Sequence, residues 1–345
     1  MKPVMKLAVW LLLAAAVIPL GSCANLALSS VQPIINTSPA LDEPPAAPPN
    51  AEVIISIAPT PEATSDPTPT ALPTLPARAT VAADTSLVTG CRSGGEVVRG
   101  KWPSKVFGGP HDYAIYLPPC YDEEGNQARY PIIYLFHGWP MDENHWLELG
   151  IAPTAARLIN SGELPPFIIA LPRGDREGVY NRTSGGANSW ESAMIDEFIP
   201  YIERTYRVQR QRDGRAIGGI SRGGVWALEI AFRHPEMFAS VGAHSAALSV
   251  NNAAAGFDPL DLAVTAPIET MRIFIDAGDR DWTRDSARTL SRLLEARYIP
   301  HTYTLGVGEH VDSYWKSQVE AYLKFYAAPW KAEKLVHQPP GSSAQ

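Results

Sequence analysis

Between about residues 90 and 330, short continuous apolar runs alternate with longer segments in which apolar residues recur about every three to four positions. Continuous apolar runs are typical of strands that a parallel sheet buries on both faces, and residues 131–136 and 167–171 have this character. The sequence therefore predicts a buried central sheet. Its other strands are predicted at residues 113–117, 215–218, 239–242 and 271–275, with a last strand that contains Tyr303 and Leu305.

The segments between these runs carry the spacing of helices. In one of them Leu290, Leu293 and Leu294 are expected to face inward, and Asp285 is expected to cap the N-terminus. Strands that alternate with helices are typical of an α/β fold, with a mostly parallel central sheet flanked by helices. The helices are predicted at residues 194–206, 223–233, 285–298 and 311–327.

The N-terminal pattern is different. Lys2 and Lys6 precede an apolar run over residues 7–20, and small residues then lead to Cys23. This is typical of a lipoprotein signal peptide over residues 1–22, after which Cys23 carries the lipid. The run is short for a membrane-spanning helix, which needs about 20 apolar residues. We therefore expect a protein exported to the bacterial cell envelope and lipid-anchored to a membrane; an ordinary signal peptide or an uncleaved anchor is the alternative.

Composition divides the rest of the chain. Residues 23–89 are rich in Pro, Thr and Ala and cannot bury enough apolar area to fold, so we expect a lipid-anchored, disordered linker. Residues 90–330 form the predicted folded domain, and residues 331–345 a disordered tail.

Charge and cysteine content narrow the range of functions. The 345 residues carry a formal net charge of −7, with a pI near 5.6, which argues against nucleic acid as a partner. In an oxidising compartment Cys91 and Cys120 are expected to form a disulfide across about 30 residues, with two free thiols as the alternative. The sequence contains no metal-binding pair, phosphate-binding loop or dinucleotide motif, so we expect no metal and no cofactor.

The most informative motif is Gly-Ile-Ser-Arg-Gly at residues 219–223. It lies between a predicted strand and a predicted helix, the context of the nucleophile elbow of α/β-hydrolases. A side chain at Gly219 or Gly223 would clash with neighbouring backbone in so tight a turn. The motif predicts an α/β-hydrolase fold with Ser221 as the nucleophile.

A serine hydroxyl needs a base, usually a histidine oriented by a carboxylate. In α/β-hydrolases these residues follow the serine in the order acid, then histidine, each on a loop after a strand. His310 follows the last predicted strand and is the predicted base. Asp281 is the predicted acid; Asp279 shares its loop, and Asp276 lies within the preceding strand.

The oxyanion of the tetrahedral intermediate needs backbone N–H donors. We expect these donors to be the amides of Arg222 and Trp139. A Gly/Asn/Ser-rich loop at residues 172–190 is expected to cover part of the cleft. Several loop tryptophans suit an aromatic or sugar-bearing substrate, but packing of the loops is the simpler explanation of most of them. The predicted substrate contacts are Trp139, Trp190, Arg222, His244 and Trp282, whereas His111, His145, His234, His301 and His337 are expected in surface or loop positions.

Over residues 95–328 the chain resembles the esterase D type of esterases, the Putative esterase family, which includes feruloyl and acetyl-xylan esterases, S-formylglutathione hydrolases, siderophore esterases and mycolyltransferases. The resemblance rests on the segments 130–138, 197–206, 215–221, 234–240 and 278–281, and on Glu309-His310 with Trp315 after it. It implies Ser221, Asp281 and His310 as the catalytic triad. Arg222 departs from the family, which usually has methionine there.

These observations predict a secreted, membrane-anchored serine carboxylic-ester hydrolase that acts through an acyl-enzyme on a small-molecule or carbohydrate ester. An acyltransferase with a sugar or lipid alcohol as acceptor is the first alternative. A non-catalytic surface-binding lipoprotein on the same scaffold is the second. The sequence leaves the oligomeric state open, as well as which membrane carries the anchor.

Overall fold

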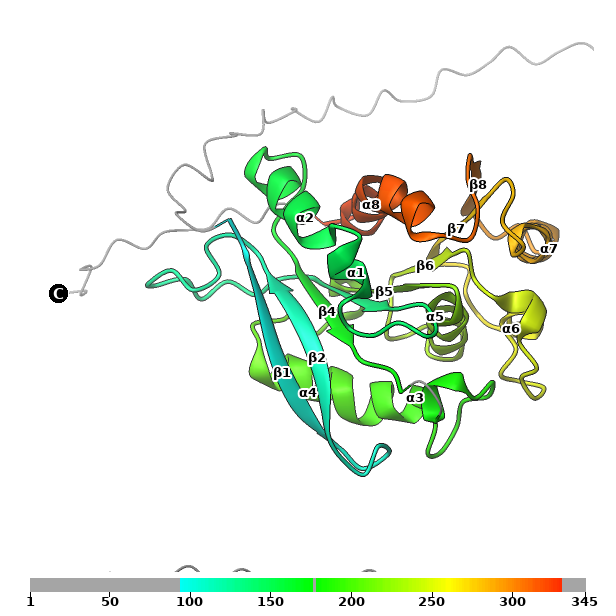
Figure 1. The fold of residues 1–345 in the computed structure, drawn as a ribbon, viewed down its shortest axis with the longest axis horizontal. Coiled ribbons are helices and arrows are strands. Elements are labelled where there is room, and N and C mark those ends of the chain that lie inside the picture. Colours follow the sequence, from blue (N-terminus) through cyan, green and yellow to red (C-terminus); the bar gives the residue numbers. More distant parts are fainter. Residues whose placement is uncertain (1–93, 176–177, 331–345) are drawn as a thin grey trace, which may run out of the picture. The chain divides into compact units, whose positions relative to one another are not determined.

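The computed structural model describes residues 94–175 and 178–330 (Figure 1). The predicted signal peptide, Cys23, the linker, Cys91 and the tail at residues 331–345 lie outside the described residues, so the predictions made for them stay predictions.

An eight-stranded sheet forms the centre of the fold (Figure 1). The first two strands form an antiparallel hairpin, and β2 pairs antiparallel with β4. From β4 onward all pairings are parallel, as the sequence predicts. Across the sheet the strands are β1 (Glu96–Ser104), β2 (Gly109–Leu117), β4 (Ile168–Pro172), β3 (Ile132–Phe136), β5 (Arg215–Ile220), β6 (Ser240–His244), β7 (Arg272–Gly278) and β8 (His301–Gly306).

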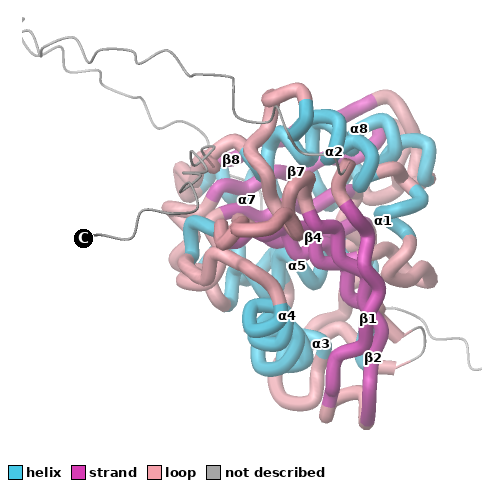
Figure 2. The backbone as a smooth tube through the Cα atoms, turned by 90° about the vertical axis from the view of Figure 1, so that its left-hand side faces the viewer, coloured by secondary structure: helices cyan, strands magenta, loops and turns pink. Residues whose placement is uncertain are grey.

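Helices cover both faces of this sheet (Figure 2). One face packs against α1 (His145–Glu148), α2 (Ile151–Asn160) and α8 (Asp312–Ala327). The opposite face packs against α3 (Trp190–Ser192), η2 (Ala193–Phe198), α4 (Ile199–Thr205), α5 (Arg222–Arg233), α6 (Pro259–Thr265) and α7 (Arg284–Ala296). Short 3-10 turns lie at η1 (Val179–Asn181), η3 (Arg212–Gly214) and η4 (Leu248–Val250).

The alternation of side chains along a strand explains why the central runs are apolar throughout. In β3, Ile133 and Leu135 point into the core on the side of α1, α2 and α8, whereas Ile132, Tyr134 and Phe136 point into the core on the other face. A strand with both faces covered cannot carry polar residues in either position without burying them. This organisation leaves the carboxyl ends of the parallel strands as the place for polar chemistry.

Three local features differ from the sequence prediction. The edge strand β1 was not predicted, because only Trp102 and Ser104 of its residues are buried and no apolar pattern results. The predicted helix at 194–206 begins with the π-helical turn η2, since Pro200 has no N–H to continue the α-helical bonding. Asp285 is not the N-cap of α7: Thr283 has that position, and Asp285 lies in the first turn.

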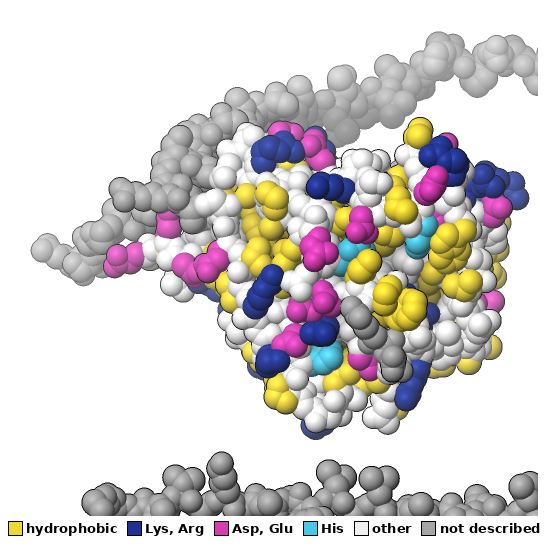
Figure 3. All heavy atoms as spheres, in the orientation of Figure 1, with side chains coloured by type: hydrophobic (Ala, Val, Ile, Leu, Met, Phe, Trp, Pro, Cys, Tyr) yellow, Lys and Arg dark blue, Asp and Glu magenta, His cyan; other side chains and the backbone are white. Residues whose placement is uncertain are grey.

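No helix within the described ranges combines the length and apolar character needed to cross a bilayer. On the face drawn in Figure 3, basic and acidic side chains are intermingled with apolar ones rather than gathered by sign.

Candidate active site

Ser221 lies in the turn between β5 and α5, as the motif predicts, with φ 54° and ψ −115°. A Cβ atom at Gly219 would come within 2.3 Å of the Gly223 backbone, and one at Gly223 within 2.5 Å of the His137 carbonyl oxygen. No side chain fits at either position, so both glycines are needed for this turn. A non-glycine residue at positive φ is strained, and such strain is common at functional sites.

The three side chains predicted as nucleophile, base and acid meet at the carboxyl ends of β5, β7 and β8. The Nε2 atom of His310 lies 2.9 Å from Oγ of Ser221. On the other side of the imidazole ring, Nδ1 lies 3.0 Å from Oδ1 and 3.1 Å from Oδ2 of Asp281. This order of groups allows a hydroxyl proton to pass to the imidazole while the carboxylate stabilises the imidazolium.

Asp281 is buried, and burial alone would raise the pKa of its carboxyl. Hydrogen bonds from His310, Thr283 and Ser245 outweigh that effect and hold the pKa below its usual value. The ionised carboxylate accepts only, so it fixes His310 with the proton on Nδ1 and the lone pair on Nε2 toward Ser221.

The two other aspartates considered for this role are engaged elsewhere. Asp279 accepts a hydrogen bond from the Gly308 amide at 2.9 Å, and its side chain is 46% exposed. Asp276 is buried at the end of β7 and accepts hydrogen bonds from His244 and from two tyrosines. Among the described residues, Asp281 is the carboxylate in hydrogen-bond contact with His310.

The segment 137–139, the oxyanion loop from here on, lies against the elbow. A Cβ atom at Gly138 would be 3.6 Å from Cβ of Ser221. The Gly138 carbonyl accepts hydrogen bonds from Nδ1 of His137 at 2.9 Å and from the Met141 amide at 2.8 Å. In a trans peptide the N–H points opposite to the C=O, so these bonds also fix the direction of the Trp139 N–H.

His137 can donate from Nδ1 because its other ring nitrogen accepts. Nε2 lies 2.7 Å from the Gly174 amide, which only donates. Burial lowers the pKa of His137 to about 4, and the ring is therefore neutral at ordinary pH. The tautomer is thus set by the fold.

Tyr180 connects the loop at residues 172–190 to both parts of the site. Its hydroxyl donates to the His137 carbonyl at 2.5 Å. Its own carbonyl accepts from Nε of Arg222 at 3.2 Å and from Nε1 of Trp226 at 2.8 Å. The Arg222 side chain is only 8% exposed and also donates to Oδ1 of Asn251. The predicted substrate contact by this side chain is therefore corrected: Arg222 fastens the loop.

The three predicted tryptophan contacts have different surroundings: Trp282 borders His310, Trp139 belongs to the oxyanion loop, and Trp190 lies in the core. Trp139 and Trp282 are 52% and 50% exposed, and the Trp282 ring lies 4.7 Å from that of His310. Trp190, in contrast, is fully buried between Tyr180 and Phe136. The prediction for Trp190 was wrong because its loop ends at that residue and α3 begins there.

The predicted substrate contact by His244 is also wrong. His244 is fully buried at the end of β6, where Nδ1 lies 2.7 Å from Oδ1 of Asp276 and Nε2 lies 2.8 Å from the Tyr326 hydroxyl. Tyr314 and Tyr322 each donate to Oδ2 of Asp276 at 2.8 Å. The His244 carbonyl accepts a hydrogen bond from the Ser221 amide at 2.9 Å. The buried network around His244 therefore stabilises the turn that carries Ser221.

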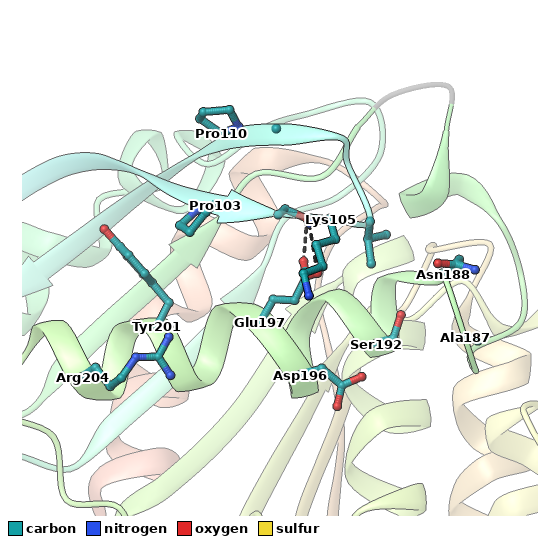
Figure 4. Close-up of a pocket in the computed structure, with 13 residues that line it drawn as sticks. Pro103, Lys105, Pro110, Ala187, Asn188, Ser192, Asp196, Glu197, Tyr201 and Arg204 are labelled. Carbon is teal, nitrogen blue, oxygen red and sulfur yellow. Dashed lines mark hydrogen bonds between the residues drawn. The ribbon is translucent and has the colours of Figure 1, made fainter.

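A cavity of about 660 Å³ lies between the β1–β2 hairpin and the segment α3–η2–α4 (Figure 4). Pro103 and Pro110 line the hairpin side, and Tyr201 lines the helical side. Glu197 joins the two sides by accepting a hydrogen bond of 2.6 Å from Ser104. None of the three triad side chains lines this cavity.

Comparison with known proteins identifies the family of the chain. The family described as "Putative esterase" matches residues 104–326. The endo-1,4-beta-xylanase/feruloyl esterase of Xylanibacter ruminicola is 31% identical over 172 residues, 48% of this chain and 22% of that protein. An esterase of Mycobacterium tuberculosis is 35% identical over 141 residues, 39% of this chain and 29% of that protein. The match thus spans less than a third of either relative.

Solved structures show the same fold. A ferulic acid esterase superposes with a TM-score of 0.62 at 27% identity, over 68% of this chain and 99% of that one. An S-formylglutathione hydrolase from Agrobacterium tumefaciens superposes with a TM-score of 0.58 at 17% identity, over 69% of this chain and 96% of that one. With its eight-stranded α/β-hydrolase sheet and a family match over residues 104–326, the chain belongs to the Putative esterase family.

Proposed function

We propose that this protein is a serine esterase that hydrolyses carboxylic esters through an acyl-enzyme intermediate. The observation that carries this proposal is the contact of Ser221 Oγ with His310 Nε2 at 2.9 Å, with Asp281 on the far side of the imidazole. Membership of an esterase family and a fold shared with a ferulic acid esterase support the same activity.

In the proposed reaction, Ser221 Oγ attacks the ester carbonyl carbon while His310 takes the hydroxyl proton. The carbonyl oxygen becomes an oxyanion, stabilised by the backbone N–H groups of Arg222 and Trp139. His310 then gives its proton to the departing alcohol, leaving an acyl-serine. Water attacks the acyl group with His310 as base, and the acid leaves as Ser221 regains its proton.

The proposed substrate is an ester of an aromatic acid carried by a small molecule or a carbohydrate. Trp282 is half exposed beside His310, and Trp139 is half exposed in the oxyanion loop, so that both rings are available to stack on a flat acyl group. The names of two relatives, a feruloyl esterase and a ferulic acid esterase, support this class.

We also propose an exported protein anchored to a membrane by a lipid on Cys23, with a disulfide between Cys91 and Cys120. The signal-like pattern at residues 1–22 and the even number of cysteines after Cys23 support this location. The Pro/Thr/Ala-rich segment would then place the esterase domain away from the membrane.

Replacing Ser221 with alanine tests the reaction. We expect Ser221→Ala to lose hydrolysis of p-nitrophenyl esters by at least about 10⁴-fold and to lose labelling by a fluorophosphonate probe, because no acyl-enzyme can form. The matched control is Ser317→Ala, which removes an exposed hydroxyl on α8 and is expected to behave as the wild type. A Ser221→Ala protein that still hydrolyses the ester or accepts the probe would remove Ser221 from the mechanism.

A further inference from the structure

A second aspartate–histidine pair lies beside the triad. His145, expected from the sequence to be a surface or loop residue, is only 1% exposed at the start of α1. Its Nδ1 accepts a hydrogen bond from the Gly138 amide at 3.2 Å. Its Nε2 lies 3.1 Å from Oδ1 of Asp312, the first residue of α8. In this pair the histidine contacts the backbone amide of Gly138, whereas in the triad the histidine contacts the hydroxyl of Ser221.

The contacts of His145 define its protonation. A backbone N–H can only donate, so Nδ1 must carry the lone pair and Nε2 the proton. That proton points at the Asp312 carboxylate, which favours this tautomer. The Trp315 ring packs nearly perpendicular to the imidazole, with centroids 5.8 Å apart, and limits its rotation. His145 is therefore an oriented acceptor for the oxyanion loop.

His145 holds the peptide plane that precedes Gly138, together with Tyr180, whose hydroxyl donates to the His137 carbonyl of the same plane. His137 and Met141 hold the Gly138 carbonyl, and His145 holds the Gly138 N–H on the other side of the same residue. A Cβ atom at Gly138 would lie 3.5 Å from Cε1 of His145 and 3.6 Å from Cβ of Ser221. Gly138 is thus enclosed between His145 and the nucleophile, and both peptide planes that flank it are fixed.

The pair also joins two catalytic segments that are distant in sequence. Asp312 follows His310 closely in the chain, and Trp315 packs against the rings of both His310 and His145. A displacement of the segment that carries His310 would therefore also displace the oxyanion loop, because Asp312 contacts His145 and His145 contacts the Gly138 amide.

We propose that His145 and Asp312 are positioning residues, which keep the oxyanion loop in place for transition-state binding by holding the Gly138 amide. The inference rests on the proposed esterase function. An oxyanion donor contacts charge that develops only in the transition state, so loss of its position lowers kcat and leaves KM nearly unchanged.

Asp312 offers the cleaner test because its side chain is 52% exposed and its replacement does not disturb the core. We expect Asp312→Ala to lower kcat for a p-nitrophenyl ester about tenfold, with KM within about twofold of the wild type. Asp312→Asn keeps an oxygen that accepts the Nε2 proton and should recover most of the loss. The matched control is Asp261→Ala, which removes an exposed aspartate from the first turn of α6 and should leave kcat unchanged.

A second series tests His145 itself. The side-chain oxygen of asparagine can occupy about the place of Nδ1, so His145→Asn should still accept the Gly138 N–H and stay within about tenfold of the wild-type kcat. His145→Phe keeps the ring volume but accepts nothing, and we expect a loss of kcat of about a hundredfold. Unfolding temperatures measured alongside identify any variant whose loss reflects misfolding.

Hydrogen–deuterium exchange of the Gly138 amide gives a readout that needs no activity. Exchange should be faster in Asp312→Ala and in His145→Phe than in the wild type. Unchanged exchange, a wild-type kcat in both variants, or a loss confined to KM would each overturn the positioning role. A wild-type protein that neither hydrolyses esters nor reacts with a fluorophosphonate would count against the proposed function alone, since the exchange result still decides the inference.

Discussion

At the scale of single residues, Asp281 decides, in the proposed mechanism, which nitrogen of His310 acts as the base. Its carboxylate is held ionised by Thr283, Ser245 and His310 itself, so it does not compete for the proton it orients. We expect Asp281→Asn to lower kcat about 10³–10⁴-fold, because an amide can favour the wrong tautomer of His310. Steady-state kinetics with a p-nitrophenyl ester measure the effect.

Asp279→Asn is the natural control for this variant, since Asp279 shares the loop and was the alternative acid in the sequence. Asp279 caps the Gly308 amide and does not contact His310, so its variant should keep a kcat within about threefold of the wild type. The assignment fails if the two variants exchange their behaviour.

Some residues of the site could be predicted from the sequence, and others could not. Chain order and loop position were enough to propose Ser221, Asp281 and His310, which the fold then brings together. They were not enough for His244 and His145, each of which was misplaced. Whether a histidine after a strand faces the cleft or the core depends on where that strand ends and on which residues pack against it. The local sequence pattern determines neither.

At the scale of elements, α5 and α3 each contribute one carboxyl group to a buried pair, Glu229 and Glu191. Glu229 of α5 is fully buried, and a Cβ atom at Gly185 would lie 2.4 Å from Oε1 of Glu229 and 2.2 Å from Oε2 of Glu191. Burial favours the neutral form of Glu191 as well, but hydrogen bonds from His234 and Arg233 outweigh it and lower the pKa of Glu191 to about 2. Burial, and then the charge of Glu191, raise the pKa of Glu229 to about 8.

This difference predicts an unusual pH dependence for Glu229. In the unfolded chain the carboxyl loses its proton near its ordinary pKa of 4.5, whereas the folded protein retains the proton up to about 8. Folding stability contributed by Glu229 is therefore present at acid pH and is lost as the pH rises from about 4.5 to about 8. Glutamine has the same shape and no charge, so Glu229→Gln should stabilise the protein by about 1–3 kcal/mol at pH 8 and by much less at pH 5.

Urea unfolding of the wild type and Glu229→Gln at both pH values measures this difference. Glu236→Gln is the control, since the Glu236 side chain is 69% exposed and its replacement should have a small effect at either pH. Equal free-energy differences for Glu229→Gln at pH 5 and pH 8 would contradict the raised pKa.

Elements also divide into those a sequence predicts and those it does not. The apolar runs that became β3 and β4 were found because both faces of these strands are buried. The hairpin strand β1 was missed because an edge strand with mostly exposed residues has no such run. The π-helical turn before α4 was not predicted, because the apolar residues around it keep helical spacing. Pro200 is the one sequence feature that indicates an interruption of the α-helical bonding.

At the scale of the whole molecule, the described contacts of the proposed catalytic site all come from segments that follow strands of one sheet. The triad comes from segments after β5, β7 and β8, the oxyanion loop from the segment after β3, and all of these strands belong to one sheet. The proposed lipid anchor on Cys23 contributes nothing to these contacts, since all of them lie within residues 94–330. Location and catalysis should therefore be separable by mutation.

Cys23→Ser makes this separation testable in the full-length chain. Serine lacks the thiol that is proposed to carry the lipid on Cys23. Without acyl chains, the hydrophobic attraction that holds the protein at a bilayer is lost. We expect the wild type to sediment with membranes and the variant to appear in the soluble fraction, with the same kcat per molecule toward a p-nitrophenyl ester. Immunoblots and esterase assays of the two fractions measure both quantities. A variant that stays with the membranes would instead favour an uncleaved N-terminal anchor, because the apolar run at residues 7–20 would then remain attached to the domain.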